Sequence, residues 1–579
     1  MFLKNLWLLA SFMLMVGCVS LGSDNKKLLI NKPDNAASVM SAKPDKAAEN
    51  IVVTPMSSAL LFSLLGGEIA GQRGEMRLAS AFYTDASKRS GDPQVALRAA
   101  QVALFTNNTV AAKSAIELLL QKGVMTPQVH RLALTVYLRL SDMANSQKYM
   151  TLLLKEKSAP MRNEVLNIGQ IILKNTAPEI ADKMVGYLLS KSQYEAAAYL
   201  IQSQFKLNQN DLIGAVQAAR DAVKQDHSWP VGFVQLAKVY EKQGDTQQAL
   251  LVLKEAQATL DDVILLKAYG QLLARDAQYE QAERSLVQVL TKRPGDAETT
   301  YALALVYLKR GNGLSASHQF KKLVTHAGYH SKAVFYLGRI SYQKKQYGDA
   351  LKWYAQVALG PEYIAAQKSM AMTEGTMGNL AAARKRLKEL RQHYAAQEKQ
   401  FYLLEAEILL DEKQYEQVYA LMTEALNKDN DASTLRYTRS IALTELTRIE
   451  EAEKDLLLVL DADPANANTL NALGYLLASK TFRFETARQY LAKALSLKPN
   501  EPAILDSMGW LDYREGQYEK ALGLLQRAYA RSPDGEIAAH LGEVLWVLGR
   551  QAEAKEVWRA AMVRDPSNKY LLNALKKLK

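Results

Sequence analysis

Cysteine is the scarcest residue in this chain, because Cys18 is the only one among 579 residues. A single thiol cannot form a disulfide within the chain, and no other cysteine remains for thiol catalysis or for a cysteine-ligated metal. Long apolar runs are scarce as well. No segment beyond the N-terminal one reaches eighteen consecutive apolar residues, so we expect no transmembrane helix there.

Recognisable catalytic motifs are also missing. The sequence has no glycine-rich phosphate loop ending in Lys-Ser or Lys-Thr, no Gly-x-Ser-x-Gly and no His-Glu-x-x-His. Of its seven histidines, His318, His326 and His330 lie closest together, and we interpret them as surface residues rather than metal ligands. The sequence therefore predicts a protein without enzymatic activity, without a metal site and without a cofactor.

The surroundings of Cys18 indicate export. A charged Lys4 precedes an apolar stretch over residues 6–16, and a small Gly17 stands directly before the cysteine. This order predicts a secretory signal over residues 1–17, too short to be a membrane span. Met15-Val16-Gly17-Cys18 resembles the lipobox of bacterial lipoproteins. The resemblance implies acylation of Cys18; a plain secretory signal is the alternative.

The resemblance to lipoproteins also implies a location. Val19 and Ser20 follow the cysteine, and in lipoprotein sorting an aspartate at the first of these positions implies retention in the inner membrane. Its absence implies a lipid-anchored protein of the outer membrane that faces the periplasm. Residues 18–57 are rich in Asn, Lys, Asp, Ser and Ala and show no helical or strand period, which predicts a disordered tether behind the lipidated cysteine.

A repeat of about 34 residues fills the remainder of the chain. Near the C-terminus each unit has a glycine, an alanine about twelve residues later, and a proline about twelve residues after that. Three consecutive units give Gly474, Ala487, Pro499, Gly509, Ala521, Pro533, Gly542, Ala554 and Pro566. This spacing resembles the tetratricopeptide repeat, a pair of antiparallel helices. Small residues let the paired helices approach closely, and proline begins the next unit because it cannot continue a helix.

The same register extends backwards through the chain. The small position is at Ser440, Ala406, Ala371, Gly338, Ala304, Gly270, Ala237, Ser203 and Gly169, with weaker copies at Leu134, Ala100 and Gly67. We therefore predict an all-α fold, a superhelical solenoid of about fifteen helical hairpins. Divergent repeats occupy residues 58–235, regular repeats occupy 236–566, and a capping helix occupies 567–579.

A solenoid of this kind has a concave surface suited to recognition. In tetratricopeptide arrays this surface is formed by side chains of the first helix, six and three residues before the small position and one and four residues after it. The candidate protein-binding residues at these places are Tyr301, Phe335, Arg339, Tyr342, Asn471, Tyr475, Asp506, Trp510, Tyr513, Glu543 and Trp546. Aromatic side chains with arginine and carboxylates are typical of binding hot spots. The alternative is that the tryptophans pack between hairpins, as we expect for Trp353 and Trp558.

The charge of the chain restricts its partners only weakly. A formal net charge of +12 would suggest nucleic acid for a cytosolic protein. For an exported lipoprotein it favours anionic lipid, cell-wall polymers or an acidic protein. We therefore expect a periplasmic protein partner and the outer membrane as contacts, and no nucleic acid.

Four stretches resemble a specific group of proteobacterial outer-membrane lipoproteins. They are Glu68-Ile69-Ala70-Gly71-Gln72-Arg73-Gly74, Asn471-Ala472-Leu473-Gly474-Tyr475, Ile504-Leu505-Asp506-Ser507-Met508-Gly509-Trp510 and Glu536-Ile537-Ala538-Ala539-His540-Leu541-Gly542-Glu543. The group includes the LbcA-type adaptors of periplasmic carboxyl-terminal processing proteases. The resemblance implies a non-catalytic scaffold that holds such a protease and delivers substrates, such as cell-wall hydrolases, to it. The alternative function is an assembly factor for an envelope machine such as a pilus, a secretin or a polysaccharide exporter.

Overall fold

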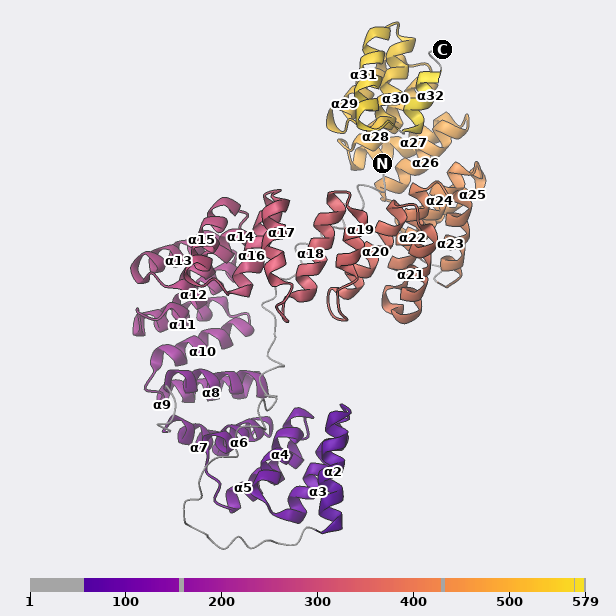
Figure 1. The fold of residues 1–579 in the computed structure, drawn as a ribbon. Helices are drawn as coiled ribbons and strands as arrows, with labels where there is room; N and C mark the ends of the chain where they lie inside the picture. Colours follow the sequence, from indigo (N-terminus) through magenta and orange to yellow (C-terminus); the bar gives the residue numbers. More distant parts are fainter. Residues whose placement is uncertain (1–56, 156–160, 429–432, 567, 577–579) are drawn as a thin grey trace. The chain divides into compact units, whose positions relative to one another are not determined.

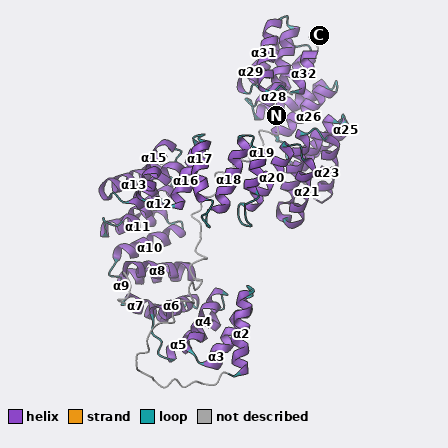
Figure 2. Cartoon of the chain, viewed as in Figure 1, coloured by secondary structure: helices purple, strands orange, loops and turns teal. Residues whose placement is uncertain are grey.

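The computed structural model describes residues 57–155, 161–428, 433–566 and 568–576. In these ranges it has thirty-one α-helices, one short 3₁₀-helix and no strand (Figure 2). The predicted all-α class is confirmed. No helix in these ranges combines the length and the apolar character that crossing a bilayer requires.

The chain divides into two compact units at Tyr329 and His330. The described part of the first unit consists of eight consecutive helical hairpins (Figure 1). Their helices are α2 (Ser58–Gln72), α3 (Met76–Ser90), α4 (Pro93–Phe105), α5 (Thr109–Gln121), α6 (Pro127–Arg139), α7 (Met143–Leu154), α8 (Met161–Asn175), α9 (Pro178–Lys191), α10 (Glu195–Asn208), α11 (Leu212–Gln225), α12 (Pro230–Gln243), α13 (Thr246–Leu260), α14 (Val263–Arg275), α15 (Tyr279–Lys292), α16 (Ala297–Lys309) and α17 (Gly313–Leu323).

The described part of the second unit has seven hairpins and a final single helix. Its helices are α18 (His330–Gln343), α19 (Tyr347–Tyr354), α20 (Tyr363–Thr376), α21 (Leu380–His393), α22 (Glu398–Asp411), α23 (Tyr415–Lys428), α24 (Ser433–Glu445), α25 (Ile449–Ala462), α26 (Ala467–Lys480), α27 (Phe484–Leu497), α28 (Pro502–Arg514), α29 (Tyr518–Arg531), α30 (Gly535–Val547), α31 (Gln551–Arg564) and α32 (Lys569–Lys576). The described helices thus form fifteen hairpins followed by a cap, as the repeat period predicts.

Local sequence explains where the helices begin and end. Helix α12 ends at Gly244, whose φ of +88° suits glycine. Asp245 then caps α13 by accepting a hydrogen bond from the Gln248 backbone N–H at 3.0 Å. Proline occupies the first helical turn of α4, α6, α9, α12 and α28, where its missing N–H costs no hydrogen bond.

The small residues of the repeat allow close contact within each hairpin. A Cβ added to Gly474 would lie 2.5 Å from Leu491 Cγ, and one added to Gly509 would lie 2.8 Å from Leu525 Cγ. At Gly542 the Trp558 indole fills the same space. Larger side chains here would therefore force the helices apart.

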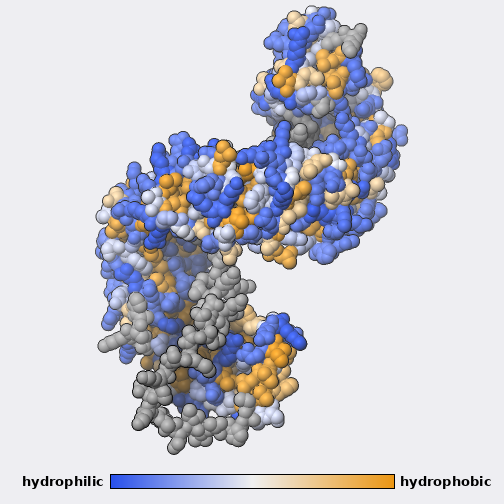
Figure 3. Space-filling view, in the orientation of Figure 1, coloured by the Kyte–Doolittle hydropathy of each residue, from blue (hydrophilic) through white to orange (hydrophobic). Residues whose placement is uncertain are grey.

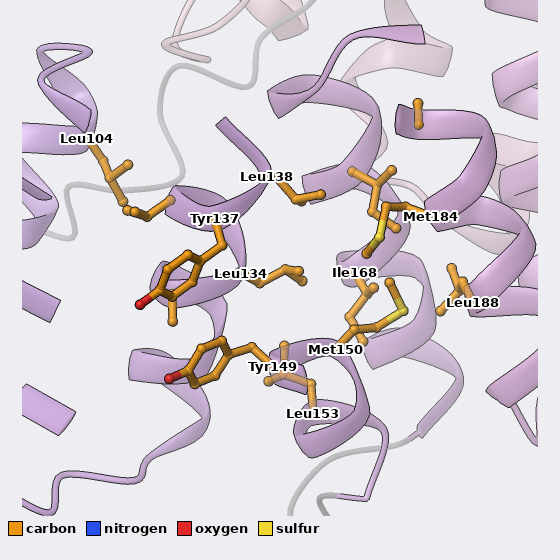
Figure 4. Close-up of a cluster of buried hydrophobic side chains, with 14 of the residues drawn as sticks. Leu104, Leu134, Tyr137, Leu138, Tyr149, Met150, Leu153, Ile168, Met184 and Leu188 are labelled. Atoms are coloured by element: carbon orange, nitrogen blue, oxygen red, sulfur yellow. The ribbon is translucent and has the colours of Figure 1, made fainter. Parts of the chain in front are cut away.

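The interior consists of a series of clusters along the stack. In the largest, side chains from five helices, α4 and α6–α9, interdigitate (Figure 4). The labelled ones are Leu104, Leu134, Tyr137, Leu138, Tyr149, Met150, Leu153, Ile168, Met184 and Leu188. Each hairpin is stabilised mainly by its neighbours, as expected of a repeat protein.

The two described ends of the solenoid differ in character. On α2, exposed apolar side chains gather on one face, namely Leu61, Phe62, Leu65 and Ile69 (Figure 3). At the other end, α32 packs on α30 and α31 through Leu571 and Ala574, which are buried. Within the described residues, the last hairpin is thus covered by a capping helix, whereas the apolar face of α2 is exposed.

Candidate protein-binding surfaces

The first helices of successive hairpins lie next to one another and form one continuous face in each unit. Hydrogen bonds join Gln170 on α8 to Gln204 on α10 (2.8 Å) and the Tyr342 hydroxyl on α18 to Thr376 Oγ1 on α20 (3.1 Å). In the first unit, the second helices α5, α7, α9, α11 and α13 lie on the outer side of the curved stack (Figure 1). We call the surface formed by the first helices the inner face of each unit.

In the first unit, the candidate Tyr301 is half-buried on α16. Its ring lies 6.0 Å from the Phe320 ring and 5.4 Å from the Tyr329 ring, measured between centroids. Tyr301 is therefore part of an aromatic cluster at the end of this unit, with part of its surface accessible.

Three candidates lie together on α18 of the second unit and are half-buried. The Phe335 ring packs at 5.9 Å from the Tyr354 ring, and the Arg339 guanidinium lies 5.5 Å from the Tyr336 ring centroid. Tyr342 reaches α20 through its hydroxyl. This part of the inner face combines aromatic surface with a cation, which is the combination expected at a protein-binding site.

Farther along the second unit, Glu407 on α22 and Lys368 on α20 are half-buried charged groups. Burial, and then the nearby Asp411 carboxylate, raise the pKa of Glu407 to about 7. Burial lowers the pKa of Lys368, which also hydrogen-bonds Gln400 Oε1 at 3.4 Å. The inner face therefore carries a carboxyl group whose charge changes close to neutral pH.

The last repeats hold a buried network of charged and aromatic groups around His540 on α30. Its Nδ1 lies 2.9 Å from Asp506 Oδ1 on α28. The Trp510 ring stacks on the imidazole at 4.0 Å and on the Tyr513 ring at 4.8 Å. Burial alone would lower the pKa of His540, but the Asp506 carboxylate, followed by Glu536 and Glu543, raises it above the ordinary 6.5.

The same network reaches the capping helix. The Tyr475 hydroxyl on α26 donates a hydrogen bond to Glu536 Oε1 on α30 at 2.9 Å. Burial raises the pKa of Glu536 and also that of Tyr570 on α32. Lys569 Nζ contacts Glu445 Oε2 on α24 at 2.6 Å. Helix α32 is thus attached to the inner face of three earlier hairpins.

The candidates of the last repeats differ in accessibility. Asn471 and Asp506 are only 2% and 5% exposed, so neither side chain is accessible to a partner. Tyr475, Trp510, Tyr513, Glu543 and Trp546 are half-buried. Trp546 packs 5.9 Å from Trp558, measured between ring centroids, and Trp558 is 1% exposed, as expected for a packing residue.

Four residues of the network were not among the sequence candidates: His540, Glu536, Lys569 and Tyr570. The signal that could have found His540 is its position two residues before Gly542, where the two preceding repeats have the small residues Ala472 and Ser507. Among the described residues, no group of three His, Cys, Asp or Glu side chains could hold a metal ion. Cys18 lies outside the described residues.

Comparisons with known proteins agree with the repeat architecture. Tetratricopeptide-repeat family models match residues 301–364, 467–501 and 507–569. The TPR repeat-containing protein PA4667 of Pseudomonas aeruginosa is 40% identical over 211 residues, which is 36% of each chain. Anaphase-promoting complex subunit 7 of Mus musculus is 29% identical over 114 residues, or 20% of each chain. The matched region thus spans about a third or less of these relatives.

Two solved structures show a limited likeness. Pseudomonas aeruginosa pilF is 19% identical and covers 36% of this chain and 96% of its own, with a TM-score of 0.31. The Cut9 and Hcn1 complex of the APC/C is 14% identical and covers 90% of this chain and 96% of its own, with a TM-score of 0.32.

The helical hairpins and the family matches define the class of this protein. It is an all-helical solenoid of the tetratricopeptide-repeat type, and proteins of this class are scaffolds for protein–protein interaction. Its inner faces are the surfaces on which such interactions are expected.

Proposed function

We propose that this chain is a non-catalytic, periplasm-facing lipoprotein of the outer membrane that delivers substrates to a carboxyl-terminal processing protease. Support for the cellular location comes from the lipobox-like sequence before Cys18 and from the absence of an aspartate directly after it. Support for the adaptor role comes from the resemblance of the repeat motifs to LbcA-type lipoproteins. Cell-wall hydrolases are the substrates that this resemblance implies.

One structural observation carries the binding function. Phe335, Arg339 and Tyr342 are half-exposed on successive turns of α18 and share one face with side chains of α20. Rings and a guanidinium held on rigid helices lose little entropy when a partner docks. A scaffold that holds a protease and a substrate together raises the effective concentration of one for the other without performing any chemistry.

Capture from an envelope extract tests this function. The bait is the full chain, and the triple variant Phe335→Ala, Arg339→Ala and Tyr342→Ala is compared with a control, Phe482→Ala and Arg527→Ala, at exposed positions of the same unit. We expect mass spectrometry to find a processing protease with cell-wall hydrolases on the bait and on the control. The triple variant should retain its helicity and capture several-fold less protease.

The opposite outcome has a definite meaning. If pilus, secretin or polysaccharide-export subunits are captured in place of a protease, the chain is an assembly factor and the adaptor function is wrong. If both variants capture the protease as well as the unaltered chain does, α18 is not the protease-binding surface.

A further inference from the structure

A row of amide side chains lines the inner face of the first unit. A surface that binds a folded partner would not need such a row. At the position directly after the small residue, α4, α8, α10 and α14 have Gln101, Gln170, Gln204 and Gln271. All four are half-buried. The same position holds Thr135 on α6 and Lys238 on α12, so hydrogen-bonding side chains occupy it in six successive hairpins.

A second row of amides runs parallel to the first. Six residues before the small position, α4, α6 and α8 have Gln94, Gln128 and Asn163, all exposed. These positions are seven residues from the first row, which is two helical turns, so both rows lie on the same side of the helices. The inner face therefore presents amides on both sides of a central strip.

That central strip is mostly apolar. Three residues before the small position stand Leu97, Leu166 and Val234, which are half-buried, and Leu200, which is buried in the core. The two cations at this position are paired, because Arg131 Nε donates to Glu164 Oε1 at 2.9 Å and Lys267 Nζ donates to Asp296 Oδ2 at 2.9 Å. The strip thus presents apolar surface and neutralised charge.

Amide side chains have the same hydrogen-bonding groups as a peptide backbone. Each glutamine has one carbonyl acceptor and an NH₂ donor, and Gln170 already bonds Gln204 as one peptide group bonds another, at 2.8 Å between Nε2 and Oε1. Packed helices lie about 8–10 Å apart, and an extended chain advances about 3.3 Å per residue. Each hairpin would therefore meet the backbone once in about three residues, and the apolar strip would contact side chains between those points.

We propose that the inner face of the first unit binds an extended, unfolded polypeptide segment through its backbone, largely irrespective of sequence. This inference rests on the proposed function, in which such a segment belongs to a substrate awaiting proteolysis. The inner face of the second unit differs, since Arg339, Met372, Glu407, Ile441 and Tyr475 occupy the position of the glutamines there. Recognition of unfolded chain is therefore a property of the first unit.

Binding of a permanently unfolded probe tests the proposal. The probe is fluorescein-labelled, reduced and carboxymethylated α-lactalbumin, and native α-lactalbumin is the folded control. The full chain carries Cys18→Ser so that no acyl chain contributes, and fluorescence anisotropy measures the dissociation constant. We expect binding of the unfolded probe only, and less than about a twofold change in affinity between low and physiological salt, because amides rather than charges make the contacts.

Two sets of variants test whether binding depends on the glutamines of the inner face or on glutamines anywhere on the unit. Gln170→Ala, Gln204→Ala and Gln271→Ala together should weaken binding by about tenfold or more, since each lost hydrogen bond weakens binding several-fold. The matched control is Gln247→Ala, Gln281→Ala and Gln288→Ala, three exposed positions on the second helices α13 and α15. It should bind within about twofold of the parent chain.

A second inner-face variant controls for the possibility that the first variant loses binding because it misfolds. Gln94→Ala, Gln128→Ala and Asn163→Ala alter only exposed side chains and should also weaken binding. The proposal is overturned if folded and unfolded probes bind equally, if salt abolishes binding, or if both inner variants bind like the control. Protease capture by the full chain would be unaffected by that result, so failure here differs from failure of the adaptor function.

Discussion

At the scale of single residues, the buried charges of the last repeats are the most unusual feature. Asp506 and His540 are almost completely buried, and Glu536 lies within the same network. Burying an ion pair rarely adds much stability, but removing one partner leaves the other charge without compensation. Without His540, the buried Asp506 carboxylate would lack a compensating charge. His540 therefore stabilises the contact between α28 and α30.

The substitution His540→Phe tests this dependence. It keeps a ring to stack on Trp510 and removes both the charge and the hydrogen bond to Asp506, so we expect a loss of about 3–5 kcal/mol. The control is His393→Phe on the exposed surface of α21, which should change stability by less than about 0.5 kcal/mol. Thermal unfolding followed by circular dichroism measures both.

The effect should also depend on pH in a defined direction. The groups that face His540 are Asp506, Glu536 and Glu543, and together they raise its folded-state pKa above 6.5. Stability from protonated His540 is therefore complete below about pH 6.5 and is lost as the pH rises through the folded-state pKa. The difference between the unaltered chain and His540→Phe should shrink from pH 6 to pH 9. A difference that grows over this range would contradict a stabilising imidazolium.

At the scale of elements, the capping helix shows how much one buried side chain contributes to the stability of the last hairpin. Leu571 is fully buried under α30 and α31, whereas its neighbour Leu572 is 41% exposed. We expect Leu571→Ala to cost about 2–5 kcal/mol through lost burial and a cavity, and Leu572→Ala to cost much less. Hydrogen exchange should rise in α30–α32 for the first variant only. Unchanged exchange there would mean that α32 does not stabilise the last hairpin.

Sequence periodicity predicts the elements better than their side-chain contacts. The spacing of Gly474, Gly509 and Gly542 predicts hairpins because a glycine contact between two helices is a local requirement that recurs in every unit. The repeat position also places Tyr342 and Trp510 on the inner face. It could not show that Asp506 is buried, because that burial depends on His540 from the next hairpin and on the ring of Trp510 that stacks on it. Contacts between the helices of two hairpins do not follow from the register of one.

At the scale of the whole molecule, the two units offer different chemistry on the same architecture. The inner face of the first unit is rich in amides and apolar side chains, and that of the second has aromatic rings, Arg339 and a carboxyl group, Glu407, with a pKa of about 7. Because stability in a solenoid is mainly a sum of contacts between neighbours, each inner face can be altered without unfolding the distant one. Under the proposed function, the two faces would bind two kinds of partner independently.

The proposed anchor determines where these faces act, and Cys18→Ser tests it. Several acyl chains, at about 0.8 kcal/mol per buried CH₂, would hold the chain at a membrane durably, and no helix of the described residues is long and apolar enough to span a bilayer. We expect the unaltered chain in the outer-membrane fraction and Cys18→Ser in the soluble periplasmic fraction, by density-gradient fractionation and immunoblotting. Ser20→Ala, two residues away, is the matched control and should stay with the membrane. If Cys18→Ser still requires detergent for release, the anchor is not the acylated cysteine, and the exposed apolar face of α2 becomes the place to look for membrane contact.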